Sequence, residues 1–263
     1  MVVTPTPLPS QPTLQIRWEA LPEDFKLDDE PVENVGQPLI AGALRESLEL
    51  VGYIQPEMLI ASNLGICATV NDNLVIKAPD WMYVARVAPL PPNTDRRSYT
   101  PHLEGDVPQV VMEFLCETEG SEYSSKQTFP PGKWFFYEQI LQIPIYVIFN
   151  PAQGALEVYQ RQGDRYQLVS PLDHQRYWLE PMNLFLGVWQ GEKEGRSGYW
   201  LRWWDAAGNL LPWAVEQMEQ QQQQLEQERQ RAEQERQRAE QERQRAERLA
   251  AQLRSLGIDP EQV

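Results

Sequence analysis

Side chains that bind zinc or form disulfides are scarce in this 263-residue sequence, which contains only two cysteines and two histidines. Neither His102 nor His174 lies close in the sequence to Cys67 or Cys116, so the ligand spacing of an ordinary zinc site is missing. Two cysteines this far apart are more typical of buried thiols in a reducing compartment than of a disulfide framework. We therefore expect neither a zinc site nor a disulfide scaffold.

Long apolar runs are missing as well. No segment approaches the ~18 apolar residues of a membrane span, and the N-terminal residues 1–12 lack the basic and apolar regions of a signal peptide. We accordingly expect a cytoplasmic protein without membrane partners. The motifs G-x-S-x-G, G-x-x-x-x-G-K-[ST] and G-x-G-x-x-G are also absent, which counts against the common hydrolase, nucleotide-binding and dehydrogenase classes.

Positive charge is in short supply, because 23 Lys and Arg residues face 38 Asp and Glu residues and the net charge is −15. Residues 216–263 hold 11 acidic and 8 basic residues, so most of the negative excess lies in the rest of the chain. Nonspecific affinity for nucleic acid comes mainly from Lys and Arg neutralising phosphates. The charge of the body therefore disfavours nucleic-acid binding.

Aromatic residues are plentiful, with nine Trp, ten Tyr and seven Phe. Each large aromatic side chain buries ~150–250 Å², so a sizeable core is expected. Six of the tryptophans lie between residues 178 and 213, and we interpret them as capping one end of a sheet, with a binding platform as the alternative. The expected organisation is a disordered proline-rich arm (1–15), one folded domain (16–213), a charged helix or weak coiled coil (214–257) and a short tail (258–263).

Hydrophobic periodicity predicts an α/β fold. Residues 107–115 form a nearly continuous apolar run, which is typical of a central strand covered on both faces. A second buried strand at 144–149 follows a helix at 133–142, and this order predicts a crossover unit in a mixed sheet flanked by helices. The remaining expected elements are a helix at 35–51, strands at 58–62, 69–70, 74–77 and 81–87, and an edge hairpin at 155–161 and 166–170.

The C-terminal segment contains the unit QERQRAE three times without change, over residues 227–247. Alanine therefore recurs every seven residues, which is the period of a coiled coil. The second apolar position of each heptad is taken by Glu or Arg, while Glu and Arg three or four residues apart stabilise a lone helix. We weigh a solvated single helix against weak self-association through residues 249–256.

Acidic residues beside expected strands are the strongest sign of chemistry. Asp80 follows Pro79, and Glu113 lies inside the apolar strand. An unpaired acid is costly to bury, so Glu113 needs either a cationic partner or a wet cleft that holds a metal ion. Lys133, at the start of the next helix, is a natural third member, because carboxylates bind Mg²⁺ and an ammonium group beside them can orient a water molecule.

These residues resemble a known pattern. Pro79-Asp80, the run VVME at 110–113, Lys133-x3-Tyr137 and the segment IPIYVIFNP at 143–151 together are similar to the Uma2 family, whose members are restriction-endonuclease-like proteins of the PD-(D/E)xK superfamily. The resemblance spans about residues 20–180. The repeat-rich tail after a Trp-rich segment resembles a cyanobacterial branch of that family. The resemblance implies a restriction-endonuclease-like mixed sheet flanked by helices.

The resemblance also implies roles for residues. Asp80 and Glu113 would bind the metal and Lys133 would be the catalytic lysine, while Glu46, Glu122 and Lys126 are accessory candidates. The simple superfamily motif places lysine two residues after the acid, where this chain has Leu115, so Lys133 or Lys126 has to reach the site from elsewhere. Cys116 occupies a position where the family often has serine.

Two functions follow as hypotheses. The first is a Mg²⁺- or Mn²⁺-dependent endonuclease acting on DNA, with a homodimer as one arrangement and Arg86, Arg96, Arg97 and Lys126 as a basic rim. The second is a noncatalytic scaffold that retains the nuclease fold and binds a protein partner through its helical tail. The acidic body favours the second. Convergence of Asp80, Glu113 and Lys133 would favour the first.

Overall fold

The computed structural model of the protein describes residues 14–19, 35–115 and 121–255. It divides into two compact units, residues 1–211 and 212–263. Most of the expected N-terminal arm (1–15), Cys116 and the expected tail (258–263) lie outside the described residues. Within the described part of the chain, no helix has both the length and the apolar character needed to cross a membrane.

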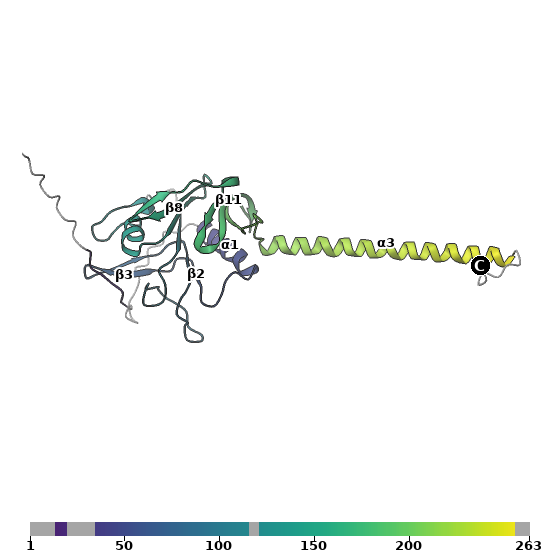
Figure 1. Ribbon diagram of the computed structural model, residues 1–263, viewed down its shortest axis with the longest axis horizontal. Coiled ribbons are helices and arrows are strands. Elements are labelled where there is room, and N and C mark those ends of the chain that lie inside the picture. Colours follow the sequence, from purple (N-terminus) through teal and green to yellow (C-terminus); the bar gives the residue numbers. More distant parts are fainter. Residues whose placement is uncertain (1–13, 20–34, 116–120, 256–263) are drawn as a thin grey trace, which may run out of the picture. The chain divides into compact units, whose positions relative to one another are not determined.

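The first unit contains a six-stranded mixed sheet with the strand order β2-β5-β6-β7-β8-β9. Figure 1 labels two of these strands, β2 and β8. The two parallel neighbours in the sheet are β6 and β7, and the other pairs are antiparallel. All residues of β6 are buried, which explains the unbroken apolar run, since both faces of the strand are covered. The predicted central strand, crossover and edge hairpin are confirmed. The strands are β2 (Leu59–Ala61), β5 (Trp81–Val84), β6 (Val110–Phe114), β7 (Ile145–Asn150), β8 (Ala155–Gln162) and β9 (Arg165–Leu168).

Two three-stranded antiparallel sheets accompany the large one. The first has the order β1-β3-β4, with β1 (Ile16–Arg17), β3 (Ile66–Val70) and β4 (Asn73–Lys77). The second has the order β10-β11-β12, with β10 (Tyr177–Leu179), β11 (Leu184–Lys193) and β12 (Arg196–Trp204). Sequence patterns predicted parts of the first sheet and none of the second.

The Trp-rich segment is thus a sheet of its own, which the sequence analysis did not foresee. Four consecutive residues of β12, 200–203, are buried, so the strand shows no polar and apolar alternation and the period-2 signal is lost. Trp203 packs against Trp81 with ring centroids 5.7 Å apart, and its indole N–H donates to the carbonyl oxygen of Leu44 at 3.1 Å. These contacts show that Trp203 is part of the hydrophobic core.

Helices are few in the first unit. α1 (Gly36–Leu50) buries Ile40, Leu44 and Leu48, the stripe that its helical spacing predicted. The helix predicted at 133–142 begins at the expected residue but is only a short α-helical turn, α2 (Lys133–Phe135), followed by a π-helix, η2 (Phe136–Leu141). The described residues also form three 3₁₀ turns: η1 (Ser121–Tyr123), η3 (Asp173–Gln175) and η4 (Glu180–Met182).

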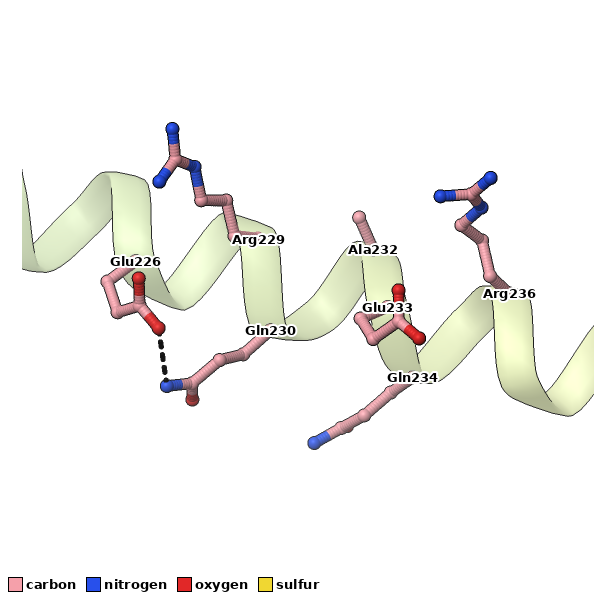
Figure 2. Close-up of a pocket in the computed structure, with 7 residues that line it drawn as sticks. All are labelled: Glu226, Arg229, Gln230, Ala232, Glu233, Gln234 and Arg236. Carbon is pink, nitrogen blue, oxygen red and sulfur yellow. Dashed lines mark hydrogen bonds between the residues drawn. The ribbon is translucent and has the colours of Figure 1, made fainter.

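The second unit is dominated by one continuous helix, α3 (Ala214–Ser255). Glutamine and glutamate four residues apart are hydrogen-bonded once per heptad, from Gln230 to Glu226, Gln237 to Glu233 and Gln244 to Glu240. Figure 2 shows the first of these bonds beside a hollow whose lining residues all belong to α3. A hollow with walls from a single helix offers no enclosed site. Self-association of α3 stays a prediction.

Candidate active site

Strand pairing brings Asp80 and Glu113 together. β5 and β6 run antiparallel with Trp81 opposite Met112, so Asp80, directly before β5, falls opposite Glu113. The Asp80 Oδ2 atom accepts a hydrogen bond from the backbone N–H of Phe114, which fixes the carboxylate against β6. Asp80 is half-buried, whereas Glu113 is 1% exposed. One acid therefore faces the interior and the other has access to solvent.

Glu113 is held by two donors from the segment α2–η2. Its Oε2 atom accepts from the Lys133 ammonium group at 2.9 Å, and its Oε1 atom accepts from the Tyr137 hydroxyl at 2.8 Å. Lys133 and Tyr137 are four residues apart, a spacing that places both side chains on one face of a helical turn. Burial raises the pKa of Glu113 to about 7; the charge of Asp80 adds to this rise and Lys133 opposes it.

Lys133 links the acids of the site. Its ammonium group also lies 4.0 Å from Oε1 of the buried Glu122. Burial alone would lower the pKa of Lys133, but the Glu113 carboxylate outweighs it and the pKa is raised, so the side chain is charged at neutral pH. The helix start is fixed by Gly132, where a Cβ atom would come within 2.0 Å of the Ser124 carbonyl oxygen. Only glycine allows this close approach.

Two tyrosines pack on the buried side of the site. Tyr137 packs against Tyr146 with ring centroids 5.2 Å apart, and the Tyr146 hydroxyl donates to the carbonyl oxygen of Glu122 at 2.9 Å. Burial, the largest cause, raises the pKa of both tyrosines. Tyr137 therefore remains a protonated donor to Glu113, and the aromatic rings keep water from the buried face of the carboxylate.

The accessory candidates divide into two groups. Glu122 joins the site through Lys133, and Lys126 lies next to the helix start, because its carbonyl oxygen accepts from Gly132 N–H at 2.9 Å. Glu46 is instead ion-paired with Lys193 on β11 at 2.7 Å, and we leave it out of the site. Of the two lysines weighed for catalysis, Lys133 is the one in direct contact with Glu113.

Two arginines of the expected basic rim form ion pairs with acidic residues outside the candidate site. Arg86 pairs with Asp106 at 3.0 Å, and Arg96 pairs with Glu104 at 2.6 Å. Their charges are therefore compensated locally.

The cationic side chain that sequence reasoning missed is Lys77, the last residue of β4 and three residues before Asp80. Burial lowers the pKa of Lys77, and repulsion from Lys133 and Lys126 lowers it further. The only signal in the sequence for a role of Lys77 at the site is that it lies three residues before Asp80.

The donor chemistry fits a hard divalent cation. Mg²⁺ is usually held by one or two carboxylates, with water and substrate phosphate completing its shell. Asp80 and Glu113 supply two carboxylates, and Asp80 is reachable from solvent. Among the described residues, no group of three or more His, Cys, Asp or Glu side chains is arranged to hold a metal. The two carboxylates of the site are as many as Mg²⁺ usually takes from a protein.

Comparison with known proteins gives a family for the chain. Residues 40–190 match the family described as Uma2, putative restriction endonuclease. The match covers more than half of the sequence and includes Asp80, Glu113 and Lys133. No curated protein gives a significant match.

Proposed function

The chain belongs to the Uma2 family of restriction-endonuclease-like proteins, and on that basis we propose that it is a Mg²⁺- or Mn²⁺-dependent endonuclease hydrolysing phosphodiester bonds in DNA. The observation that carries the proposal is the convergence of Asp80, Glu113 and Lys133. Two neighbouring carboxylates with an ammonium group beside them suit a metal ion and a scissile phosphate. The mixed α/β fold is the one expected for the family.

Each residue has a distinct role in this proposal. Asp80 and Glu113 would hold the metal ion, which when bound supplies Lewis-acid polarisation of the phosphate and lowers the pKa of a water ligand. Lys133 keeps a positive charge next to Glu113 and can orient the attacking water by hydrogen bonding. Tyr137 fixes the rotamer of Glu113 from the buried side. These positions preorganise the charges before substrate arrives.

The raised pKa of Glu113 supports a functional role over a purely structural one. Folding buries this carboxyl although its charged form is disfavoured there, and such a cost is common where a protein prepares a site for chemistry. A divalent cation would compensate the charges of Asp80 and Glu113 together.

The second candidate function is a noncatalytic scaffold. Both oxygens of Glu113 already have hydrogen-bond donors, as in a closed structural ion pair. The apolar side chains of Leu225 and Leu249 on α3 are each 51% exposed, and they are available for a protein partner or a second copy of the chain. The acidic body also favours this reading. We rank it below the nuclease because a closed ion pair does not explain a second carboxylate, Asp80, whose charge makes the ionised form of Glu113 less favourable.

Removal of divalent metal is expected to abolish cleavage. With 5 mM Mg²⁺ or Mn²⁺ the protein should nick or cut plasmid DNA, because the metal offsets charge on the scissile phosphate. Cleavage should stop when the chelator EDTA is added in excess and return when Mg²⁺ is restored. Gel electrophoresis of supercoiled plasmid measures both effects.

A matched control keeps this assay specific. Glu57→Gln removes an exposed carboxylate outside the site, and it should cut like the unmodified protein. Activity that persists in EDTA would contradict metal dependence, and no cleavage with either ion would favour the scaffold. Double-strand breaks in place of nicks would support the homodimer included in this proposal, since two sites would then act on one duplex.

A further inference from the structure

Lysines are few in this chain, and they gather at the candidate site. The sequence contains only five lysines. Three of them lie around this site. Lys133 contacts Glu113 at 2.9 Å, and Lys126 is tied to the residue before Lys133 by a backbone hydrogen bond. Lys77 comes three residues before Asp80 and interacts electrostatically with Lys126 and Lys133. The protein has a net charge of −15, so ammonium groups gathered beside the carboxylates of the site are unusual for this chain. They are a candidate contact for an anion.

The backbone holds these lysines in place from three separate elements. Lys77 ends β4, where it pairs with Ile66 of β3. Lys126 lies in the loop before α2, tied there by the hydrogen bond from Gly132 N–H to its carbonyl oxygen. Lys133 begins α2. The cluster is therefore a product of the tertiary fold and was not visible as a basic run in the sequence.

The three lysines differ in how their charges are compensated. Lys133 is paired with Glu113 at 2.9 Å. The side chains of Lys77 and Lys126 form no ion pair or hydrogen bond within the described ranges 14–19, 35–115 and 121–255. Lys77 is half-buried and Lys126 is exposed. Burial and the neighbouring ammonium groups lower the pKa of Lys77, and the attraction of Glu113 offsets this only in part. The charged form of Lys77 would therefore gain from a further anionic partner.

We propose that Lys77 and Lys126 form a phosphate-binding pair that holds the substrate backbone beside Asp80 and Glu113. An ammonium group binds phosphate as a point charge, and a polyanion gains further because it releases counterions on binding. The proposal rests on the proposed nuclease function and deepens it, since it names the residues that bring DNA to an otherwise acidic surface. Lys133 then acts on the reacting group while Lys77 and Lys126 hold the strand.

The test measures DNA binding without any divalent metal, so that the carboxylate site does not contribute. A fluorescent duplex oligonucleotide is titrated with the full-length protein in EDTA, and anisotropy is read at several salt concentrations. Lys77→Gln and Lys126→Gln should each weaken binding several-fold at low salt. Each should also reduce the slope of log K against log salt by about 0.9, the contribution of one phosphate contact.

Control variants separate this effect from misfolding and from net charge. Lys77→Arg keeps the charge and should retain most of the affinity. Arg229→Gln removes one positive charge from the exposed face of α3 and should leave the affinity and the salt slope unchanged. Lys126 is exposed, so Lys126→Gln should fold normally even if Lys77→Gln does not.

The outcomes distinguish this inference from the nuclease proposal. Unchanged affinity and slope in both glutamine variants would overturn the phosphate-binding pair, as would failure of the unmodified protein to bind the duplex at low salt. Mn²⁺ binding is followed separately by calorimetry and should be the same in Lys126→Gln as in the unmodified protein. Absence of Mn²⁺ binding in the unmodified protein would count against the metal-dependent nuclease. The DNA titration alone would then decide whether Lys77 and Lys126 bind phosphate.

Discussion

Replacing Lys133 with methionine is expected to lower the rate of DNA cleavage by about 10²- to 10³-fold, the usual cost of losing one preorganised charged donor, while divalent-metal binding persists. Lys133 is the charged group in contact with Glu113, at 2.9 Å, but it is not a metal ligand. Its removal takes away the ammonium group that orients water and leaves both carboxylates. Metal binding and catalysis should therefore separate in this variant.

The comparison is best made at pH 8.5 with Mn²⁺. Loss of Lys133 removes a charge that lowers the pKa of Glu113, so a higher pH keeps that carboxyl ionised in the variant. Cleavage rates are measured under single-turnover conditions, and Mn²⁺ affinity is measured by calorimetry. Lys133→Arg should retain part of the activity because it keeps the charge. Equal rates for Lys133→Met and the unmodified protein would remove Lys133 from the mechanism.

The stability of Glu113→Gln relative to the unmodified protein is expected to rise with pH. The folded state raises the pKa of Glu113 from 4.5 to about 7, so between these values the native protein binds a proton that the unfolded chain has lost. The free energy of unfolding of the unmodified protein therefore falls as pH rises through this window. Glutamine does not titrate, and the difference should grow in favour of the variant by about 3 kcal/mol.

Urea denaturation at pH 4.5, 6 and 8 measures this difference. The absolute stability of the variant also reflects the changed hydrogen bonds to Lys133 and Tyr137, and only its dependence on pH isolates the ionisation of Glu113. Glu57→Gln, at an exposed position, is the matched control. A variant that grows less stable relative to the unmodified protein as pH rises would mean that the ionised pair with Lys133 serves the fold. That result would favour the scaffold.

Sequence patterns predicted the parts of the fold whose burial is regular. The strands β6 and β7 were foreseen because strands covered on both faces require unbroken apolar runs, and α1 was foreseen because one face of it is apolar. The β11–β12 hairpin was missed, since its partly polar and aromatic residues show neither regular period. The π-helix η2 was also missed, because six residues are too few to separate its wider turn from an α-helix.

The candidate site was predicted only in part, and mainly through the family resemblance. Nothing local in the sequence sets the antiparallel register that brings Asp80 opposite Glu113, or shows that Lys133 reaches Glu113. Glu46 was a weaker choice. Helical periodicity predicts which face of α1 carries this residue, but it does not predict the ion pair with Lys193. Lys77 was overlooked for a similar reason. It interacts electrostatically with Lys126 and Lys133, which are about fifty residues away in sequence, and only the tertiary fold brings these residues together.

The most direct test of the central claim is a calorimetric titration with Mn²⁺ at pH 8, where Glu113 is largely ionised. Unmodified protein, Asp80→Ala, Glu113→Ala and the control Glu57→Ala are compared at equal concentration. We expect saturable binding by the unmodified protein and the control, and loss of binding in both site variants. No binding by the unmodified protein, or full binding by both site variants, would contradict a metal site formed by Asp80 and Glu113.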